Sequence, residues 1–264
     1  MTNDYVDEIN ADSLVREVIE NIVDELDPHS IYIPAIQSES LSESMQGNFE
    51  GIGVQFRMLE DTIAVSRVLE GGPSKKAGLK SGDRILMADQ DTLFSRGLKN
   101  EQVISRLKGN SSTSVRLTVY RKLQDSIYIF DIIRGPVPLP SINASYMINQ
   151  STGYIKINRF SQTTYDEFKK AINLLVSQEM KNLILDLRGN PGGYLLPAKQ
   201  IADDFLEASK PIVIVEGNNG RREQTVSSNK GLFEKGSLFI LVDEDSASAS
   251  EVIAGAIQDN DRGL

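Results

Sequence analysis

Residues 183–193 read Leu-Ile-Leu-Asp-Leu-Arg-Gly-Asn-Pro-Gly-Gly, an apolar run that ends in a glycine-rich turn. The run predicts a buried strand over residues 183–187, and the pattern after the turn predicts a helix over residues 195–206. Glycines between a strand and a helix allow backbone N–H groups to point at a developing negative charge, and the helix N-terminus adds its positive end. An ordinary tight turn is the competing interpretation. The glycine spacing fits neither nucleotide-binding motif, which disfavours a phosphate site.

Strands and helices alternate around this turn. Further strands are predicted over residues 153–158, 212–215 and 238–242, and further helices over residues 164–176 and 248–258. Thr164 and Glu167 have the spacing of a capping box at the first of these helices. Strands that alternate with helices predict an α/β layer with a largely parallel sheet.

A second turn of this kind, Asp-Glu-Asp-Ser-Ala-Ser-Ala-Ser-Glu at residues 243–251, follows the predicted strand at 238–242. Small residues at such a junction permit a sharp bend that exposes a hydroxyl beside free N–H groups, as in a nucleophile elbow. The competing interpretation is a helix N-cap, formed by Ser248 with Glu251 or by Ser250 alone. Two turns at the carboxyl ends of neighbouring strands favour a site, because α/β proteins gather their functional groups at that edge.

The segment from residue 49 to about residue 135 has a different pattern, with short strands separated by turns. Strands are predicted over residues 53–58, 62–68, 84–88, 114–121 and 126–133, and helices over residues 77–79 and 100–107. The first strand opens with Gly51, Ile52, Gly53 and Val54. Backbone N–H groups in such a turn can hold a terminal carboxylate while an extended peptide adds to the sheet edge, and a plain β-turn is the alternative.

The N-terminal region predicts an amphipathic helix over residues 12–26, because its apolar residues recur at steps of three and four. A loop or short helix is expected over residues 38–46. The chain is accordingly divided into a helical segment (1–48), a mostly-β module (49–137) and an α/β core (138–264).

Composition excludes several classes of protein. The 264 residues carry 28 Lys and Arg against 37 Asp and Glu, a net charge of −9 that argues against a nucleic-acid binder. The absence of Cys excludes thiol nucleophiles, disulfides and thiolate metal sites, and a single His excludes a His-rich metal site. That residue, His29, is expected to stabilise a turn rather than act as a base. No apolar run is long enough to cross a membrane, and the acidic N-terminus does not look like a signal peptide.

Six segments, in this order, resemble the C-terminal processing peptidases, also called tail-specific proteases. The resemblance covers nearly the whole chain and rests on residues 26–30, 49–54, 72–83, 153–155, 186–193 and 246–251. It implies a PDZ module inserted before a crotonase-like (Clp-protease-like) α/β core. It also implies a serine endopeptidase with a Ser-Lys dyad and no cofactor or metal.

Carried over by motif position, the nucleophile is Ser248. The oxyanion hole is the Ala249 amide with the amide of Gly192 or Gly193. The Gly51–Val54 turn becomes the carboxylate loop that selects flexible protein C-termini, and Asp259 matches an acidic residue that the family often carries, a solvated charge being the alternative.

The resemblance places the lysine base roughly 25 residues after the serine, which is beyond Leu264. A core incomplete at its C-terminus, and therefore inactive, is expected. It further implies a location outside the cytoplasm, in the periplasm or facing it from a membrane anchor outside these residues, and is compatible with a homo-oligomer. Two other functions stay open: a non-catalytic PDZ scaffold that only binds peptides, and an acyl-CoA enzyme on the same fold.

Overall fold

The computed structural model describes residues 11–27 and 30–264, so the prediction for His29 lies outside the described residues. The chain divides into two units, Met1–Glu43 and Ser44–Leu264, and each is described by itself. Within the described part of the chain, no helix is long and apolar enough to cross a membrane.

The N-terminal unit contains α1 (Ala11–Asp24), and α2 (Ala35–Gln46) continues from it into the second unit. The helix α1 has no buried residue. Most of its apolar stripe is exposed, at Leu14, Val15, Val18 and Ile22. The segment 38–46 is helical, which decides between the two alternatives that the sequence left there.

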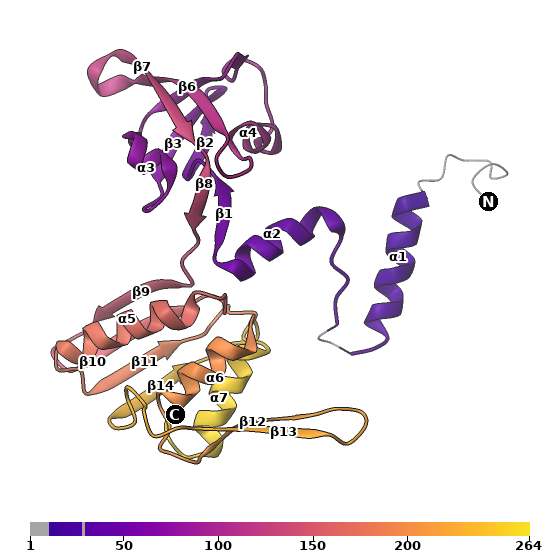
Figure 1. Ribbon diagram of the computed structural model, residues 1–264, viewed down its shortest axis with the longest axis vertical. Coiled ribbons are helices and arrows are strands. Elements are labelled where there is room, and N and C mark those ends of the chain that lie inside the picture. The colour runs from indigo at the N-terminus through magenta and orange to yellow at the C-terminus, as the bar shows by residue number, and fades with distance from the viewer. Residues whose placement is uncertain (1–10, 28–29) are drawn as a thin grey trace. The chain divides into compact units, whose positions relative to one another are not determined.

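The β-rich part of the second unit is one antiparallel sheet with strand order β2-β3-β4-β6-β7, on which β5 pairs with β4 (Figure 1). The strands are β2 (Val54–Leu59), β3 (Thr62–Val68), β4 (Arg84–Ala88), β5 (Asp91–Thr92), β6 (Ser114–Arg121) and β7 (Ser126–Ile133). A short 3-10 turn, η1 (Lys122–Gln124), joins the last two. Fully buried Ile63, Ile85 and Leu117 form the centre of its core.

Two helices accompany this sheet, α3 (Pro73–Ala77) and α4 (Asn100–Leu107). The prediction of a helix over residues 77–79 was wrong. The helix begins at Pro73, whose fixed φ suits the first helical turn. It ends at Gly78, which has a φ of 92°, a left-handed conformation that glycine adopts without strain.

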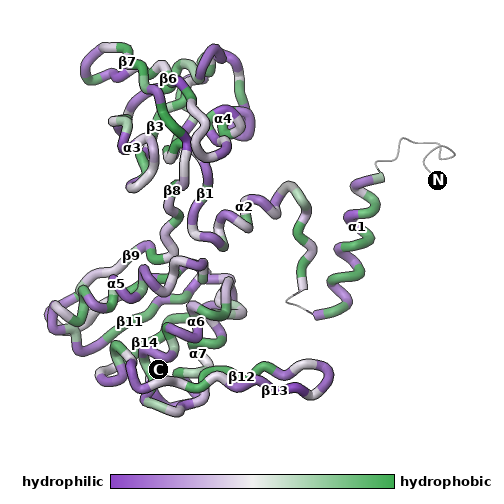
Figure 2. The backbone as a smooth tube through the Cα atoms, viewed as in Figure 1, coloured by the Kyte–Doolittle hydropathy of each residue, from purple (hydrophilic) through white to green (hydrophobic). Residues whose placement is uncertain are grey.

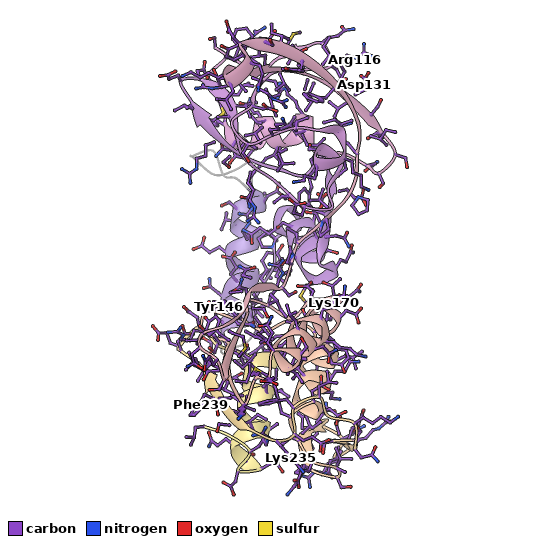
Figure 3. The ribbon with its side chains drawn as sticks, turned by 90° about the vertical axis from the view of Figure 1, so that its left-hand side faces the viewer. Arg116, Asp131, Tyr146, Lys170, Lys235 and Phe239 are labelled. Carbon is purple, nitrogen blue, oxygen red and sulfur yellow. The ribbon has the colours of Figure 1, made fainter. Side chains whose placement is uncertain are left out.

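The ion pairs of this sheet contribute differently to its stability, depending on whether they are exposed or buried. Arg116 and Asp131 pair across β6 and β7 at 2.7 Å on an exposed surface (Figure 3), where solvent screening leaves little net stabilisation. Arg121 and Asp83 pair at the same distance with side chains 11% and 1% exposed. The guanidinium also donates to the Gly78 carbonyl, so this second pair ties the end of α3 to β6.

A two-stranded ribbon carries the chain into and out of the β-rich part. It consists of β1 (Asn48–Gly51) and β8 (Gly135–Pro138), paired antiparallel, and the Leu139 amide donates to the Gly47 carbonyl at 2.8 Å. Neither strand was predicted from the sequence.

The α/β part has a four-stranded sheet of order β14-β11-β10-β9, in which β10, β11 and β14 are parallel and β9 is antiparallel. The strands are β9 (Ile142–Met147), β10 (Thr152–Ile157), β11 (Asn182–Asp186) and β14 (Ser237–Leu241). Hydrophobic residues dominate β11 and β14 (Figure 2). An antiparallel hairpin, β12 (Pro211–Glu216) with β13 (Arg222–Val226), precedes β14.

Three helices belong to this layer: α5 (Thr164–Ser177), α6 (Leu195–Asp203) and α7 (Ala249–Asp259). Helix α6 contacts both α5 and α7. Phe160, Phe168 and Phe205 are fully buried in the core of this layer, and burial of each aromatic ring contributes about 2–3 kcal/mol.

The capping box predicted at Thr164 and Glu167 was wrong. The N-cap of α5 is Thr163. Its hydroxyl donates to one oxygen of Glu167, while the other oxygen accepts from the Ser141 and Ile142 amides. The carboxylate therefore joins α5 to the start of β9, a long-range contact that no local spacing encodes.

Asp204, which follows α6, is 3% exposed, and its Oδ2 has no hydrogen-bond partner among the described residues. Burial raises its pKa to about 6, against the opposing hydrogen bond from the Leu232 amide. Because the carboxyl ionises more readily in the unfolded chain, stability falls as the pH rises from about 4 to about 6.

Asp204→Asn is expected to remove this loss. Its free energy of unfolding should exceed that of the unmodified chain at about pH 8 by on the order of 1–3 kcal/mol, with a much smaller difference at about pH 4. Urea unfolding at both pH values measures it, with exposed Asp245→Asn as the control. An equal effect at the two pH values would contradict the prediction.

Candidate active site

The two glycine- and serine-rich turns meet at the carboxyl ends of neighbouring parallel strands, β11 and β14. Gly192 lies directly against the second turn. A Cβ added to it would stand 2.8 Å from the Ala247 carbonyl oxygen and 2.8 Å from the Ser248 Cβ. Its φ is +100°, so both space and backbone conformation require glycine there.

Hydrogen bonds join the two turns. The carbonyl of Asn190 accepts from the Ala247 amide at 3.1 Å and from the Ser250 hydroxyl at 3.0 Å. The Ser246 hydroxyl donates to the Leu187 carbonyl at 2.9 Å. Two of the three serines in the motif therefore hold the turns together.

Ser248 differs from these two serines. It is exposed, and its hydroxyl donates no hydrogen bond to any residue in the described ranges. Its φ of 53° with ψ of −109° lies outside the favoured regions for a residue with a side chain, a strain that costs on the order of 1–3 kcal/mol. The Ser248 amide donates to the Glu251 carboxylate at 2.6 Å, and the Ser248 Oγ accepts from the Glu251 amide, so the two residues form a capping box. Ser248 is thus the strained N-cap of α7, and the proton of its hydroxyl is still free to be donated.

Two backbone amides of these turns are available as donors. Neither the Gly193 nor the Ala249 amide has an acceptor among residues 11–27 and 30–264. The Gly192 amide, by contrast, donates to the Asn190 Oδ1 at 2.9 Å. Of the two glycines that the sequence analysis offered for an oxyanion hole, only Gly193 therefore has a free N–H.

Gly193 is fixed by its neighbours. The Phe160 amide donates to the Gly192 carbonyl at 2.8 Å, and the Tyr194 amide donates to the Phe160 carbonyl at 2.7 Å. A Cβ on Gly193 would collide with that same Phe160 carbonyl. The loop after β10 thus holds the glycine turn in place through Phe160.

A buried ionic cluster anchors the start of the glycine turn. Asp186 is 1% exposed and accepts from the Tyr154 hydroxyl at 2.6 Å and from the Arg188 guanidinium at 2.7 and 3.0 Å. Burial acts to raise the pKa of Asp186, but these hydrogen bonds and the charge of Lys156 outweigh it, and the pKa lies well below its usual range. Burial, with the hydrogen bond to Asp186, raises the pKa of Tyr154 to about 12.

Asp243, in the second turn, forms a hydrogen bond with the glycine turn. Its carboxylate accepts from the Gly189 amide at 2.8 Å, which lowers the pKa of Asp243. The Lys156 ammonium donates to the Arg188 carbonyl at 2.7 Å and lies 3.4 Å from Asp186. The Lys156 ammonium is therefore part of the ionic cluster around Asp186.

The structure does not bring Asp259 into this site. Ser248 precedes the first residue of α7 and Asp259 is its last residue. At about 1.5 Å per residue, the helix separates their backbones by roughly 16 Å. Asp259 is exposed there.

The second candidate site is the turn at Gly51, Ile52, Gly53 and Val54, which leads into the edge strand β2. The carbonyls of Ile52 and Gly53 accept from the Ser74 and Leu69 amides at 2.7 and 3.0 Å. The Ile52 and Gly53 amides have no acceptor within the described part of the chain. An unpaired strand edge beside two free amides has the chemistry to bind an extended peptide through its carboxylate.

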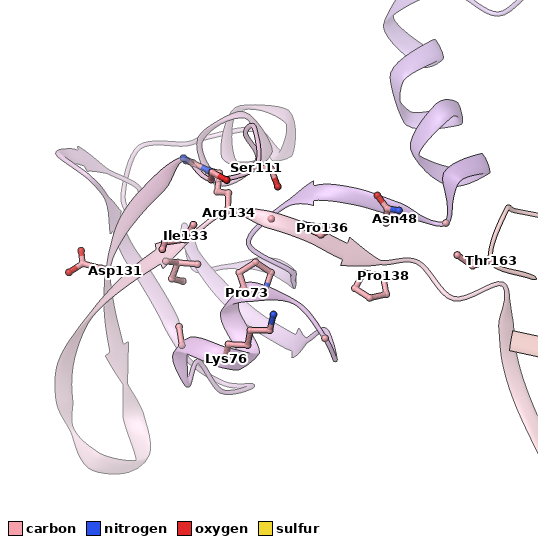
Figure 4. A pocket seen from close by; sticks show the side chains of 16 residues that line it. Asn48, Pro73, Lys76, Ser111, Asp131, Ile133, Arg134, Pro136, Pro138 and Thr163 are labelled. Carbon is pink, nitrogen blue, oxygen red and sulfur yellow. The ribbon is translucent and has the colours of Figure 1, made fainter. Parts of the chain in front are cut away.

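The β-rich part also has an open cavity of about 860 Å³ (Figure 4). It is lined mainly by α3, the end of β7 and β8, and includes neither the Gly51–Val54 turn nor Ser248. Its Arg134 guanidinium is already bound to the Arg106, Leu107 and Ser114 carbonyls, where it closes the C-terminal end of α4.

Neither the role of Asn190 nor the Asp186 cluster was predicted. Asn190 stands directly before Pro-Gly-Gly, but its complete burial and its hydrogen bonds with Ile157, Ala247 and Ser250 depend on segments far apart in the chain.

Two family models match separate parts of the chain. Residues 151–264 match Peptidase family S41, and residues 51–127 match the PDZ domain. The carboxy-terminal processing protease CtpB of Bacillus subtilis is 31% identical over 264 residues, covering 98% of this chain and 54% of its own length. A probable CtpA-like serine protease of Staphylococcus aureus is 34% identical over 263 residues, covering 98% and 51%. The chain therefore spans about half the length of these curated relatives.

Among solved structures, the photosystem II D1 C-terminal processing protease is similar over 98% of this chain and 71% of its own, with 22% identity and a TM-score of 0.48.

Proposed function

Since the chain belongs to the family of C-terminal processing peptidases, we propose that it contains the nucleophile and oxyanion hole of a serine endopeptidase that binds its substrates by their C-termini. One observation carries the proposal. Ser248 is held in a strained conformation with its hydroxyl available, beside the only glycine amide of the neighbouring turn that is free to act with Ala249. This is the arrangement that acyl transfer to serine requires.

The reaction follows from this arrangement. The Ser248 Oγ attacks the carbonyl carbon of the scissile peptide bond and loses its proton to a general base. The Gly193 and Ala249 amides donate to the oxygen that becomes negative in the tetrahedral intermediate. Collapse expels the amine, which takes the proton, and leaves an ester on Ser248 that water then hydrolyses.

We infer that the base is a lysine, as in other Ser-Lys variants of the triad. Lys156 is unsuited to this role because its ammonium is ion-paired with Asp186 and donates to the Arg188 carbonyl. None of the lysines in the described residues forms a hydrogen bond with the Ser248 hydroxyl, which supports a base outside residues 1–264, as the family resemblance implies. Without that base, these residues should hydrolyse peptide bonds very slowly. We also propose that the α/β core has a crotonase-like fold.

The proposed substrates are unfolded or flexible protein C-termini. The Ile52 and Gly53 amides would bind the terminal carboxylate, and the residues before it would extend β2 by one antiparallel strand. Binding through the backbone accepts varied sequences, provided that the chain end is extended and free.

The proposal is tested with the full-length protein that carries these residues. It should digest an unfolded protein with a free C-terminus faster than the same protein with its terminus blocked as an amide. Binding of the free terminus without any cleavage would favour the peptide-binding scaffold over the enzyme.

Amidation of a short peptide's C-terminus is expected to weaken its binding to the β-rich part at least about tenfold, because the loop loses a charged acceptor. Fluorescence anisotropy with matched free and amidated peptides measures this.

Gly53→Ala should weaken binding of the free peptide similarly. Gly53 has a φ of +79°, and an added Cβ would stand 3.2–3.3 Å from Val137 and Gly72. Gly82→Ala is the matched control, with a φ of +90° and no atom within 4 Å. If the unmodified protein bound the free and the amidated peptide with equal affinity, the Gly51–Val54 turn would not be a carboxylate loop.

A further inference from the structure

We propose that Asn190 is the positioning residue of the oxyanion hole: it takes up the Gly192 amide, leaves the Gly193 amide as the donor, and fixes the glycine turn to the turn that carries Ser248. The proposal rests on the proposed function.

Asn190 connects three separate segments and is 0% exposed. Its Nδ2 donates to the Ile157 carbonyl at the end of β10, at 3.0 Å. Its Oδ1 accepts from the Gly192 amide at 2.9 Å. Its own carbonyl accepts from Ala247 and Ser250, on either side of Ser248. The Nδ2, the Oδ1 and the backbone carbonyl of Asn190 therefore all help to hold these segments together.

The two glycine amides are oriented by different partners. Asn190 turns the N–H of Gly192 toward itself. The Gly192 carbonyl accepts from the Phe160 amide. Because the N–H and C=O of a trans peptide point in opposite directions, the N–H of Gly193 then points away from Phe160. In the sequence Asn-Pro-Gly-Gly, the Gly192 amide is thus occupied by Asn190, and the Gly193 amide is left free as a donor.

The side chain at this position needs both a donor and an acceptor. Alanine would leave the buried Gly192 amide and Ile157 carbonyl without partners. Ionised aspartate would keep the acceptor for Gly192 but place a second negative oxygen against the Ile157 carbonyl. A protonated aspartate would restore the donor, so the two forms of one variant separate the two contacts.

The experiment compares kcat and KM of the full-length protein with those of its Asn190→Ala and Asn190→Asp variants on an unfolded substrate. Asn190→Ala is expected to lower kcat about 100-fold, the effect of losing one oxyanion donor, with KM within about threefold because the carboxylate loop is untouched. The ratio of Asn190→Asp to wild-type kcat should rise as the pH falls from about 8 to about 6, as the buried carboxyl takes up a proton. A purely structural role would not produce this pH profile.

Asn260→Ala is the matched control. The Nδ2 of Asn260 also donates to two backbone carbonyls, those of Pro211 and Ala256, but at the far end of α7. The kcat of the Asn260→Ala variant should therefore stay within about twofold of wild type.

A wild-type kcat in either Asn190 variant, or a loss confined to KM, would overturn the proposal. If Asn190→Ala does not fold, the Asn190→Asp profile decides alone, and a flat ratio refutes it. Failure of the wild-type protein to cleave, or cleavage that survives loss of Ser248, would instead refute the proposed function.

Discussion

Replacing Ser248 by alanine is expected to lower kcat of the full-length protein by at least about 10⁴-fold, since loss of a serine nucleophile removes the covalent pathway. Binding of the substrate C-terminus should not change, because the Gly51–Val54 turn is a separate site. The measurement is single-turnover digestion of an unfolded protein, together with labelling of the serine by a fluorophosphonate.

The variant should fold, because Glu251 still accepts from the amide at position 248 and the lost N-cap hydroxyl is worth about 1 kcal/mol. Ser246→Ala is the informative control. Its hydroxyl bonds the Leu187 carbonyl, so its loss should lower stability while fluorophosphonate labelling persists. Undiminished cleavage by Ser248→Ala would show that the nucleophile is another residue.

Gly193→Ala is expected to have the second-largest effect, a loss of at least about 10²–10³-fold in kcat. The added Cβ would collide with the Phe160 carbonyl, and the φ of +136° is unfavourable for alanine. The turn must move away from Phe160, which carries the free amide away from Ser248. Thermal unfolding and kcat are measured together.

Gly189→Ala separates the steric effect from the cost of a positive φ. Gly189 lies in the same turn with a φ of +67°, but no atom stands within 4 Å of an added Cβ. This variant should lose about 1–2 kcal/mol of stability and little kcat. Similar kcat values for the two variants would mean that the Gly193 amide is not needed for the reaction.

Much of the fold could be predicted because local patterns determine it. The alternating strands β3, β4, β6 and β7 and the helix α4 have the predicted bounds. Strands without a local signal were missed. Two prolines, Pro136 and Pro138, conceal β8, which forms only because β1 lies opposite. The polar sequence of β13 forms a strand only by pairing with β12.

The candidate site could be predicted as far as its motifs reach. The structure brings the two turns into contact, with Gly192 against Ala247, Ser248 and Ala249, while the catalytic roles of Ser248, Gly193 and Ala249 stay predictions. The roles within each motif depended on distant partners. The Gly192 amide is occupied because Asn190 is held by Ile157, 33 residues earlier in the chain, and Asp259 is separated from Ser248 by the full length of a helix. Local spacing contains neither fact.

The ribbon of β1 and β8 has a consequence for how such a chain could arise. Gly47 and Leu139, the residues at which the chain departs toward the β-rich part and returns, are one hydrogen bond apart. A short loop could join them, so residues 48–138 have the properties of an exchangeable cassette, whose gain or loss in evolution need not interrupt the helix α2 before it or the strand β9 after it. The part proposed to bind a chain end and the part proposed to cut it can therefore diversify separately in evolution.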